Sequence, residues 1–242
     1  MKNHNVGIEM NFGIRQSFDK IEQVEDRYSG LSVAIELALP YYWDIYEPAR
    51  AHLPSIAKKI KSYGTQVLGI HAVQAPITDE KFKEWGKEIV DFARALKVKI
   101  ITLHPNNVND KINAQKGALK NFEFFSRLYD DEIIFCIETF EGKRRVFTPD
   151  ETTAFNLPMT LDTSHIRNNE KIWSLLENYK ENILNVHLSA RDKCGQHLPI
   201  DNFCKEVVGY LVKNNWKGNV ILEYMFEFHD QLLNDLEILK LI

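Results

Sequence analysis

The chain has 242 residues, of which 44% are hydrophobic and 26% are charged, and its formal net charge at pH 7 is −4. These values are ordinary for a globular protein and exclude disordered, collagen-like and fibrous chains. They give no overall positive charge that would draw the chain to nucleic acid or to an anionic membrane. No linker rich in Pro, Gly or Ser divides the sequence, so we expect one domain over residues 1–242.

The cysteines and the absence of long apolar segments bear on the cellular compartment. Cys136, Cys194 and Cys204 show no C-x-x-C spacing, so neither a disulfide framework nor a thiolate zinc site is indicated. We expect neither a signal peptide nor a membrane span, because residues 1–5 run straight into a strand-like segment and no apolar run of about 18 residues occurs. We therefore expect a soluble protein of the reducing cytoplasm, with no membrane partner.

Short apolar, β-rich runs alternate along the chain with polar loops and with longer stretches of helical periodicity. The eight runs are Val6–Phe12, Leu31–Leu39, Gln66–Ala72, Val98–Leu103, Ile133–Phe140, Met159–Asp162, Ile183–Leu188 and Asn219–Tyr224. This alternation is typical of βα units on a parallel sheet. A unit takes about 30 residues, which matches an eight-fold barrel of roughly 250 residues. The expected fold class is therefore an α/β protein, a single (β/α)8 TIM barrel.

The segments between the runs predict helices that cover the barrel. Five apolar residues step by three and four and so share one helical face. They are Phe82, Trp85, Ile89, Phe92 and Leu96. Further helices are expected within Asn109–Leu128 and, as a short element, within Pro149–Phe155, where Pro149 suits a first helical turn.

A doubly wound open sheet is the alternative fold. It needs a glycine-rich turn after the first strand, and Val6–Phe12 is followed by no G-x-G-x-x-G motif. A Walker-type phosphate loop is missing as well. We therefore expect no nucleotide cofactor.

One residue with a metal-binding side chain stands near the end of almost every apolar run. These residues are Glu36, His71, His104, Glu138, Asp162, His187 and Glu223. In a parallel barrel the carboxyl ends of the strands converge on one face, so these side chains should meet there. Buried carboxylates and imidazoles are costly unless they are paired or bound to a metal. Oxygen and nitrogen donors without thiolate suit manganese, magnesium, cobalt, iron or zinc, and the sequence does not choose among these divalent ions.

Each of these residues alone has a structural explanation, which we favour for Glu36. The last four in chain order are different, because four separate strands would each need an unrelated reason to carry a buried charge. Glu138, Asp162, His187 and Glu223 are therefore the main metal-ligand candidates.

Short motifs across nearly the whole chain, taken in order and at their spacings, resemble the xylose isomerase-like barrel superfamily. That superfamily includes sugar isomerases, ketose 3-epimerases, hydroxypyruvate isomerase, inosose dehydratase and endonuclease IV. The motifs are His71-Ala72…Pro76, His104-Pro105, Ile137-Glu138-Thr139, Leu161-Asp162-Thr163-Ser164-His165, Val186-His187-Leu188, His197-Leu198-Pro199 and Leu222-Glu223.

The resemblance implies a metal-dependent isomerase or epimerase of a small sugar, sugar phosphate or related hydroxy-carbonyl compound. In such enzymes a Glu, Asp, His, Glu quartet holds one divalent ion, and this quartet corresponds to Glu138, Asp162, His187 and Glu223. The resemblance gives the two glutamates a second role, as the acid and base that move a proton next to a metal-polarised carbonyl. His165 corresponds to a histidine that contacts substrate or a further metal.

Two alternatives stay open. The endonuclease IV branch is a multinuclear zinc phosphoesterase acting on abasic DNA, and its further ligands correspond to His71, His104, His165 and His197. One aspartate of that pattern falls on Gly195, and nothing in the sequence places Asp192 or Asp201 in its stead. The other alternative is a barrel that binds a sugar without catalysis.

The same face of the barrel supplies weaker substrate-binding candidates. They are Glu36, Trp43, Arg144 and Arg191. Trp43 belongs to the aromatic segment Tyr41–Tyr46, which suits either a lid or an interface. The two arginines suit a phosphate, of a sugar or of DNA, or are simply solvated. A homo-oligomer is compatible with the resemblance.

Overall fold

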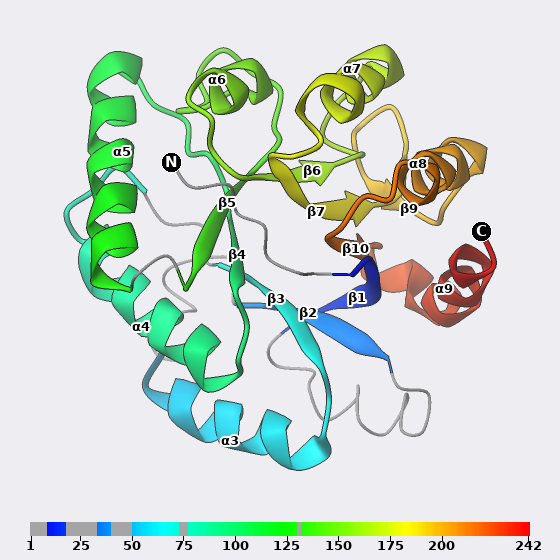
Figure 1. The fold of residues 1–242 in the computed structure, drawn as a ribbon, viewed down its shortest axis with the longest axis horizontal. Helices are drawn as coiled ribbons and strands as arrows, with labels where there is room; N and C mark the ends of the chain where they lie inside the picture. The colour runs from blue at the N-terminus through cyan, green and yellow to red at the C-terminus, as the bar shows by residue number, and fades with distance from the viewer. Residues whose placement is uncertain (1–8, 18–32, 40–49, 73–76, 130–131) are drawn as a thin grey trace.

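The structure is a computed structural model, which describes residues 9–17, 33–39, 50–72, 77–129 and 132–242. Within these residues, parallel strands close into a barrel in the order β1-β10-β7-β6-β5-β4-β3-β2 (Figure 1). The strands are β1 (Asn11–Ser17), β2 (Ala34–Ala38), β3 (Val67–His71), β4 (Ile100–Leu103), β5 (Ile134–Glu138), β6 (Met159–Asp162), β7 (Ile183–Leu188) and β10 (Asn219–Leu222). Each barrel strand pairs with the next one along the chain, and β10 closes the ring onto β1. The predicted eight-stranded TIM barrel is therefore confirmed.

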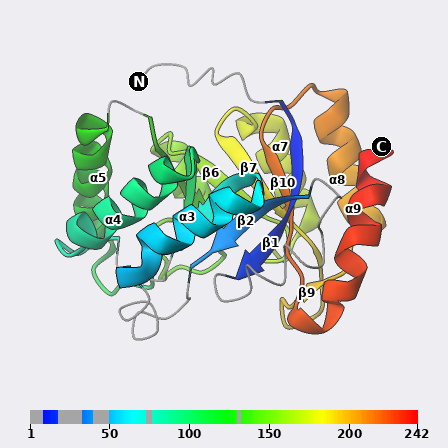
Figure 2. The same cartoon turned by 90° about the horizontal axis from the view of Figure 1, so that it is seen from below.

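Helices surround the strands, as Figures 1 and 2 show. The helical elements are η2 (Arg50–His52), α3 (Leu53–Tyr63), α4 (Phe82–Ala95), α5 (Lys111–Leu128), α6 (Pro149–Ala154), α7 (Asn169–Tyr179), α8 (Asn202–Lys213), η3 (Phe226–Gln231) and α9 (Leu232–Lys240). Between β7 and α8 the chain forms a small antiparallel hairpin of β8 (Ala190–Arg191) and β9 (His197–Leu198). Among the helices of the described segments, none combines the length and apolar character that a membrane crossing requires.

Local signals in the sequence set several of these boundaries. Helix α6 is short, as predicted, and begins with a capping box in which Thr148 and Glu151 satisfy each other's backbone N–H groups, with Pro149 in its first turn. Strands β6 and β7 have the predicted bounds.

The predicted position of the first strand is wrong. Apolar periodicity predicts this strand over Val6–Phe12, whereas β1 spans Asn11–Ser17. Pairing with both neighbours fixes the strand, because Asn11 lies opposite Asn219 of β10 and Gly13 opposite Ala34 of β2. The pattern of apolar residues alone does not predict the register of this strand against its neighbours. The correction moves Arg15 from a loop into the barrel wall.

The predicted apolar face of α4 packs into an aromatic cluster between the barrel and α5. Phe82, Trp85, Ile89 and Phe92 are buried, and the fifth predicted residue, Leu96, is partly buried. The Phe125 ring of α5 lies 5.3 Å from that of Phe82, centroid to centroid, in an edge-to-face arrangement. This packing holds α4 and α5 against β4 and β5 of the barrel.

Gly86 tests how tightly α4 and α5 pack. A Cβ at this position would lie 2.7 Å from the Phe125 ring, so we expect Gly86→Ala to destabilise the protein by about 1–3 kcal/mol despite the better helix propensity of alanine. Thermal or denaturant unfolding measures the effect. In α8 the nearest atom to a Cβ on Gly209 is 3.8 Å away, so Gly209→Ala is the matched control and should gain up to about 1 kcal/mol. A Gly86→Ala variant as stable as Gly209→Ala would contradict the described packing.

Candidate metal centre

Four of the predicted ligands converge at the carboxyl ends of neighbouring strands. Glu138 and Asp162 are the last residues of β5 and β6, His187 is the penultimate residue of β7, and Glu223 directly follows β10. One ligand atom of each lies within 4.8 Å of the others, and these four residues are called the quartet below. The first three are buried, and the side chain of Glu223 is 12% exposed. The expected convergence on one face is therefore present.

His187 lies in the middle of the quartet. Its Nδ1 is 3.0 Å from Oε1 of Glu138, 3.1 Å from Oε2 of Glu223 and 3.8 Å from Oδ2 of Asp162. Donor atoms that share one divalent ion at about 2.1 Å lie roughly 3.0–3.4 Å from one another, so most of these separations already suit an ion. Within the described residues, Oδ2 of Asp162 and Oε2 of Glu223 are buried atoms without a hydrogen bond. The donor set therefore fits a divalent cation.

Each carboxylate of the quartet has one oxygen held by the protein and one directed at the centre. Oε2 of Glu138 contacts two histidines, and Oε1 of Glu223 is paired with the Arg15 guanidinium. Oδ1 of Asp162 accepts hydrogen bonds from the N–H of Ser164 and from its hydroxyl, both at 2.7 Å. The three remaining oxygens face His187 Nδ1, so the protein fixes the direction in which each donor points.

The charges of the quartet call for a cation. Burial alone would raise the pKa of Glu138, but the neighbouring imidazoles, His104 first, hold it well below its usual value. The pKa of Glu223 is also well below normal, because Arg15 and nearby imidazoles outweigh burial. Burial lowers the pKa of His187, yet the surrounding carboxylates raise it well above its usual value. This raised pKa favours the charged imidazolium form of His187, whose positive charge would face the carboxylates as a divalent ion does.

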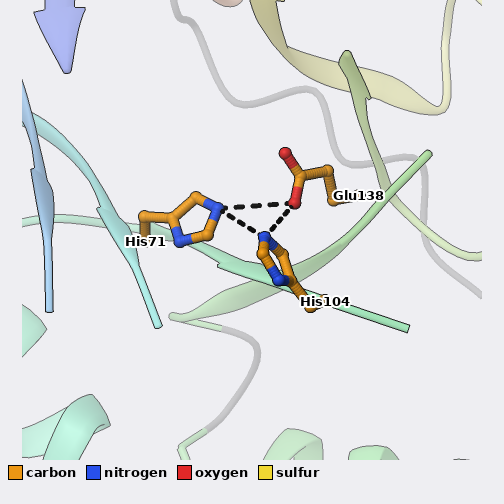
Figure 3. Close-up of side chains that lie close together, drawn as sticks. All are labelled: His71, His104 and Glu138. Carbon is orange, nitrogen blue, oxygen red and sulfur yellow. Dashed lines mark hydrogen bonds and ion pairs between the residues drawn. The ribbon is translucent and has the colours of Figure 1, made fainter. Parts of the chain in front are cut away.

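A second donor set adjoins the quartet and shares Glu138 with it. His71, at the end of β3, and His104, just after β4, point toward Oε2 of this glutamate (Figure 3). The Nε2 atoms of His104 and His71 lie 2.5 and 3.4 Å from that oxygen and 3.1 Å from each other. Burial, together with the charge of Arg15, lowers the pKa of His71 to about 4, so this imidazole is neutral and can act as a donor.

A third donor set shares Asp162 and lies nearer the rim. His165 Nδ1 is 3.4 Å from Oδ2 of Asp162, and His197 of β9 completes the group. Asp192 accepts hydrogen bonds from the turn that contains Cys194 and Gln196, and Asp201 caps α8. Neither aspartate joins the group. The described residues therefore offer no replacement for the aspartate that the endonuclease IV pattern has at the position of Gly195.

The weaker candidates lie in different surroundings. Glu36 is fully buried below His187. Arg144 is exposed and donates to Oδ1 of Asn109, at 2.8 Å. Arg191 donates to carbonyl oxygens of Thr163 and of the two residues after His165, and so fixes the β6–α7 loop. Trp43 lies outside the described residues. Substrate binding by these four stays a prediction.

Arg15 is a residue of the centre that the sequence pattern did not reveal. It lies in β1, its guanidinium pairs with Glu223, and its side chain is 18% exposed. Burial would lower its pKa, but the charges of Glu223, Glu138 and Glu36 keep it raised, so the guanidinium stays charged. The one signal in the sequence is a basic residue just after Ile14, and it becomes informative only once β1 is placed correctly.

Comparisons with known proteins bear on the fold. No family model and no curated protein matches the sequence. Among solved structures, 3-keto-D-glucoside 4-epimerase from E. coli matches with a TM-score of 0.73 and 12% identity, over 97% of this chain and 100% of that one. A xylose isomerase domain protein from Planctomyces limnophilus matches with a TM-score of 0.66 and 16% identity, over 96% of each chain.

Endonuclease IV from Thermus thermophilus matches with a TM-score of 0.61 and 15% identity, over 96% of this chain and 98% of that one. The chain thus has the barrel fold shared by xylose isomerase-like proteins and endonuclease IV, as the motif resemblance implied. At these identities the likeness shows the fold, and the activity has to be argued from the site.

The quartet predicts stabilisation by divalent ions. Zinc, manganese or cobalt added to chelator-treated protein should raise the midpoint of thermal unfolding, since a ligand at 100 times its Kd stabilises by about 2.7 kcal/mol. Asp162→Asn should remove most of this shift, because it replaces a carboxylate that faces the centre. Asp150→Asn changes an exposed carboxylate of α6 and should leave the shift intact. Equal shifts in both variants would argue against an ion at the quartet.

Proposed function

We propose that the protein is a metal-dependent isomerase or epimerase of a small polyhydroxy carbonyl compound. The observation that best supports this proposal is that Glu138 and Glu223 approach the centre from separate strands. In the barrel, β5 and β10 are separated by β6 and β7, which supply Asp162 and His187. A compound bound at the quartet thus has a carboxylate on each of two sides.

A bound divalent ion would polarise a substrate carbonyl and the hydroxyl on the adjacent carbon. The hydrogen on that hydroxyl-bearing carbon would then be more acidic. The quartet would hold that ion, with His187 donating through Nδ1. Arg15 and the His71–His104 pair would keep Glu223 and Glu138 in place while the substrate binds. The protein contribution is thus a rigid, charge-balanced centre.

The two glutamates would move the proton. Both have pKa values well below normal, so either is ionised and can accept the hydrogen of the acidified carbon. The C–H electron pair then forms the carbon–carbon double bond of an enediolate, and the carbonyl oxygen takes the negative charge. Return of the proton to the neighbouring carbon, with the hydroxyl proton passing to the former carbonyl oxygen, gives isomerisation. Epimerisation results when the second glutamate relays a proton from solvent to the opposite face of the first carbon and the first glutamate releases its proton to solvent.

The charge of the centre favours an uncharged substrate. Glu36 and the three carboxylates of the quartet face one arginine, so a single divalent ion with neutral imidazoles leaves one net negative charge. In a site of low dielectric constant this charge repels a phosphate or carboxylate placed beside the ion. We therefore propose neutral sugars ahead of sugar phosphates. The similarly folded E. coli epimerase, whose described substrate is a keto-glucoside, supports the choice.

Solvent hydrogen exchange tests the proposal and does not require the product to be identified. Incubated in D2O with a divalent ion and a panel of neutral aldoses and ketoses, the wild-type protein should place deuterium next to the carbonyl of its substrate. NMR or mass spectrometry detects the label. Glu223→Gln should slow this exchange at least ~100-fold, because the amide cannot accept the proton.

Glu206→Gln, which changes an exposed residue of α8, is the control and should exchange like the wild type. Full exchange by Glu223→Gln would contradict the assigned role of this glutamate. Sugar binding by the wild type without exchange would instead support a non-catalytic sugar-binding barrel.

A specific observation favours a second function, a multinuclear phosphoesterase of the endonuclease IV type. Glu138 is shared by the quartet and the His71–His104 pair, and Asp162 is shared by the quartet and the third donor set. Shared carboxylates are how proteins hold metal ions close together, and two close ions stabilise both oxygens of a phosphoryl transfer. Nicking of a duplex with one abasic site, in the presence of zinc or manganese, tests this function. An intact duplex would argue against it.

A further inference from the structure

Glu36 lies on the side of His187 opposite to the quartet. Its Oε2 is 2.8 Å from Nε2 of His187, whereas Nδ1 of the same ring faces the quartet. Both side chains are fully buried. Within the described residues, Oε2 of Glu36 has no hydrogen-bond partner, so its contact with His187 is an ion pair, and Nδ2 of Asn185 lies 3.2 Å from the same Nε2. One imidazole thus connects a buried carboxylate below to the donor set above.

The other oxygen of Glu36 is held by groups of the barrel interior. Asn185 of β7 donates from Nδ2 to Oε1 at 2.8 Å, and Thr102 of β4 donates a long hydrogen bond at 3.5 Å. The wall of β3 closes another side, because a Cβ on Gly69 would lie 3.1 Å from Oε1. Glu36 is therefore enclosed by side chains and backbone of the barrel interior.

From this arrangement we infer that Glu36 is a positioning residue that retains the Nε2 proton of His187. With that proton held on Nε2, the neutral ring directs its Nδ1 lone pair at the quartet, where a divalent ion would bind. The negative charge of Glu36 also makes the imidazole a stronger donor. The inference rests on the metal centre of the proposed function and is independent of the reaction catalysed there.

The surroundings of Glu36 make glutamine a poor substitute. In Glu36→Gln, a glutamine oxygen that accepted from Asn185 would place the glutamine NH2 group against Nε2 of His187. That NH2 group favours the ring form with the proton on Nδ1, where it blocks the ion. The reversed amide would place the NH2 groups of the glutamine and of Asn185 against each other. With an ion bound to Nδ1, neither orientation satisfies all three groups.

A second substitution should repair the defect. In the double variant Glu36→Gln, Asn185→Asp, the new aspartate would accept from the glutamine NH2 group and leave the glutamine oxygen to accept from His187 Nε2. The double variant thus has its carboxylate at position 185 and not at position 36, and Nε2 of His187 again has an oxygen that accepts its proton. Thr160→Val, which removes the 2.9 Å contact with Thr102 in the same interior layer, is the matched control.

Cobalt titration followed by visible absorption, together with nitrogen-15 NMR of the histidines in zinc-treated protein, tests the inference. Glu36→Gln should weaken cobalt binding ~10–100-fold. Its zinc-treated form should lose the His187 signal of a protonated Nε2 and a coordinated Nδ1. Thr160→Val should resemble the wild type, and the double variant should recover both the affinity and the signal.

Three results would overturn the inference: wild-type affinity in Glu36→Gln, a double variant as weak as Glu36→Gln although folded by circular dichroism, or a wild type that binds no cobalt. The proposed function fails separately. Cobalt binding that follows the expected order, without hydrogen exchange into any sugar, would leave the role of Glu36 standing and remove the isomerase.

Discussion

Four carboxylates lie within a few ångströms of a single imidazole in the interior of this barrel. The other groups of the centre offset the electrostatic repulsion among these carboxylates. Each has one oxygen tied to the protein and one facing His187. The tying groups differ: an asparagine amide for Glu36, a serine hydroxyl and backbone N–H for Asp162, two histidines for Glu138 and an arginine for Glu223. Because unpaired buried charge is expensive, these contacts and a central cation together make the arrangement tolerable.

The barrel provides this arrangement by placing its polar groups in layers. Thr102, Thr160 and Asn185 form a neutral hydrogen-bonded layer below the centre, between apolar residues farther down and the charged donors above. The layer lets Glu36 be buried without a second cation beside it. Function and stability are therefore coupled in the same interior through Asn185, which contacts both Glu36 and His187.

The sequence predicted the features that depend on local pattern. Strand periodicity located Asp162 at the end of β6 and His187 near the end of β7, and barrel topology then required these ends to meet. Features that depend on register or depth were not predictable. Arg15 is assigned to the barrel only once the pairing of β1 with β10 and β2 is known. The register of β2 against β3 shifts between Ile35 and Glu36, and apolar periodicity predicts neither this shift nor how deep in the barrel Glu36 lies.

The two candidate functions make opposite demands on His71 and His104. If these histidines bind a second ion, Glu138 bridges two cations through both of its oxygens, and two cations make the carboxylate a weaker base toward a substrate proton. If they only contact Oε2 as hydrogen-bonding groups, Oε1 can exchange a proton with a substrate beside the ion. A second divalent ion would also turn the net charge of the centre positive and so favour a phosphate over a neutral sugar. Whether one pair of buried histidines binds a second ion thus separates carbon-acid chemistry from phosphoester hydrolysis on the same scaffold.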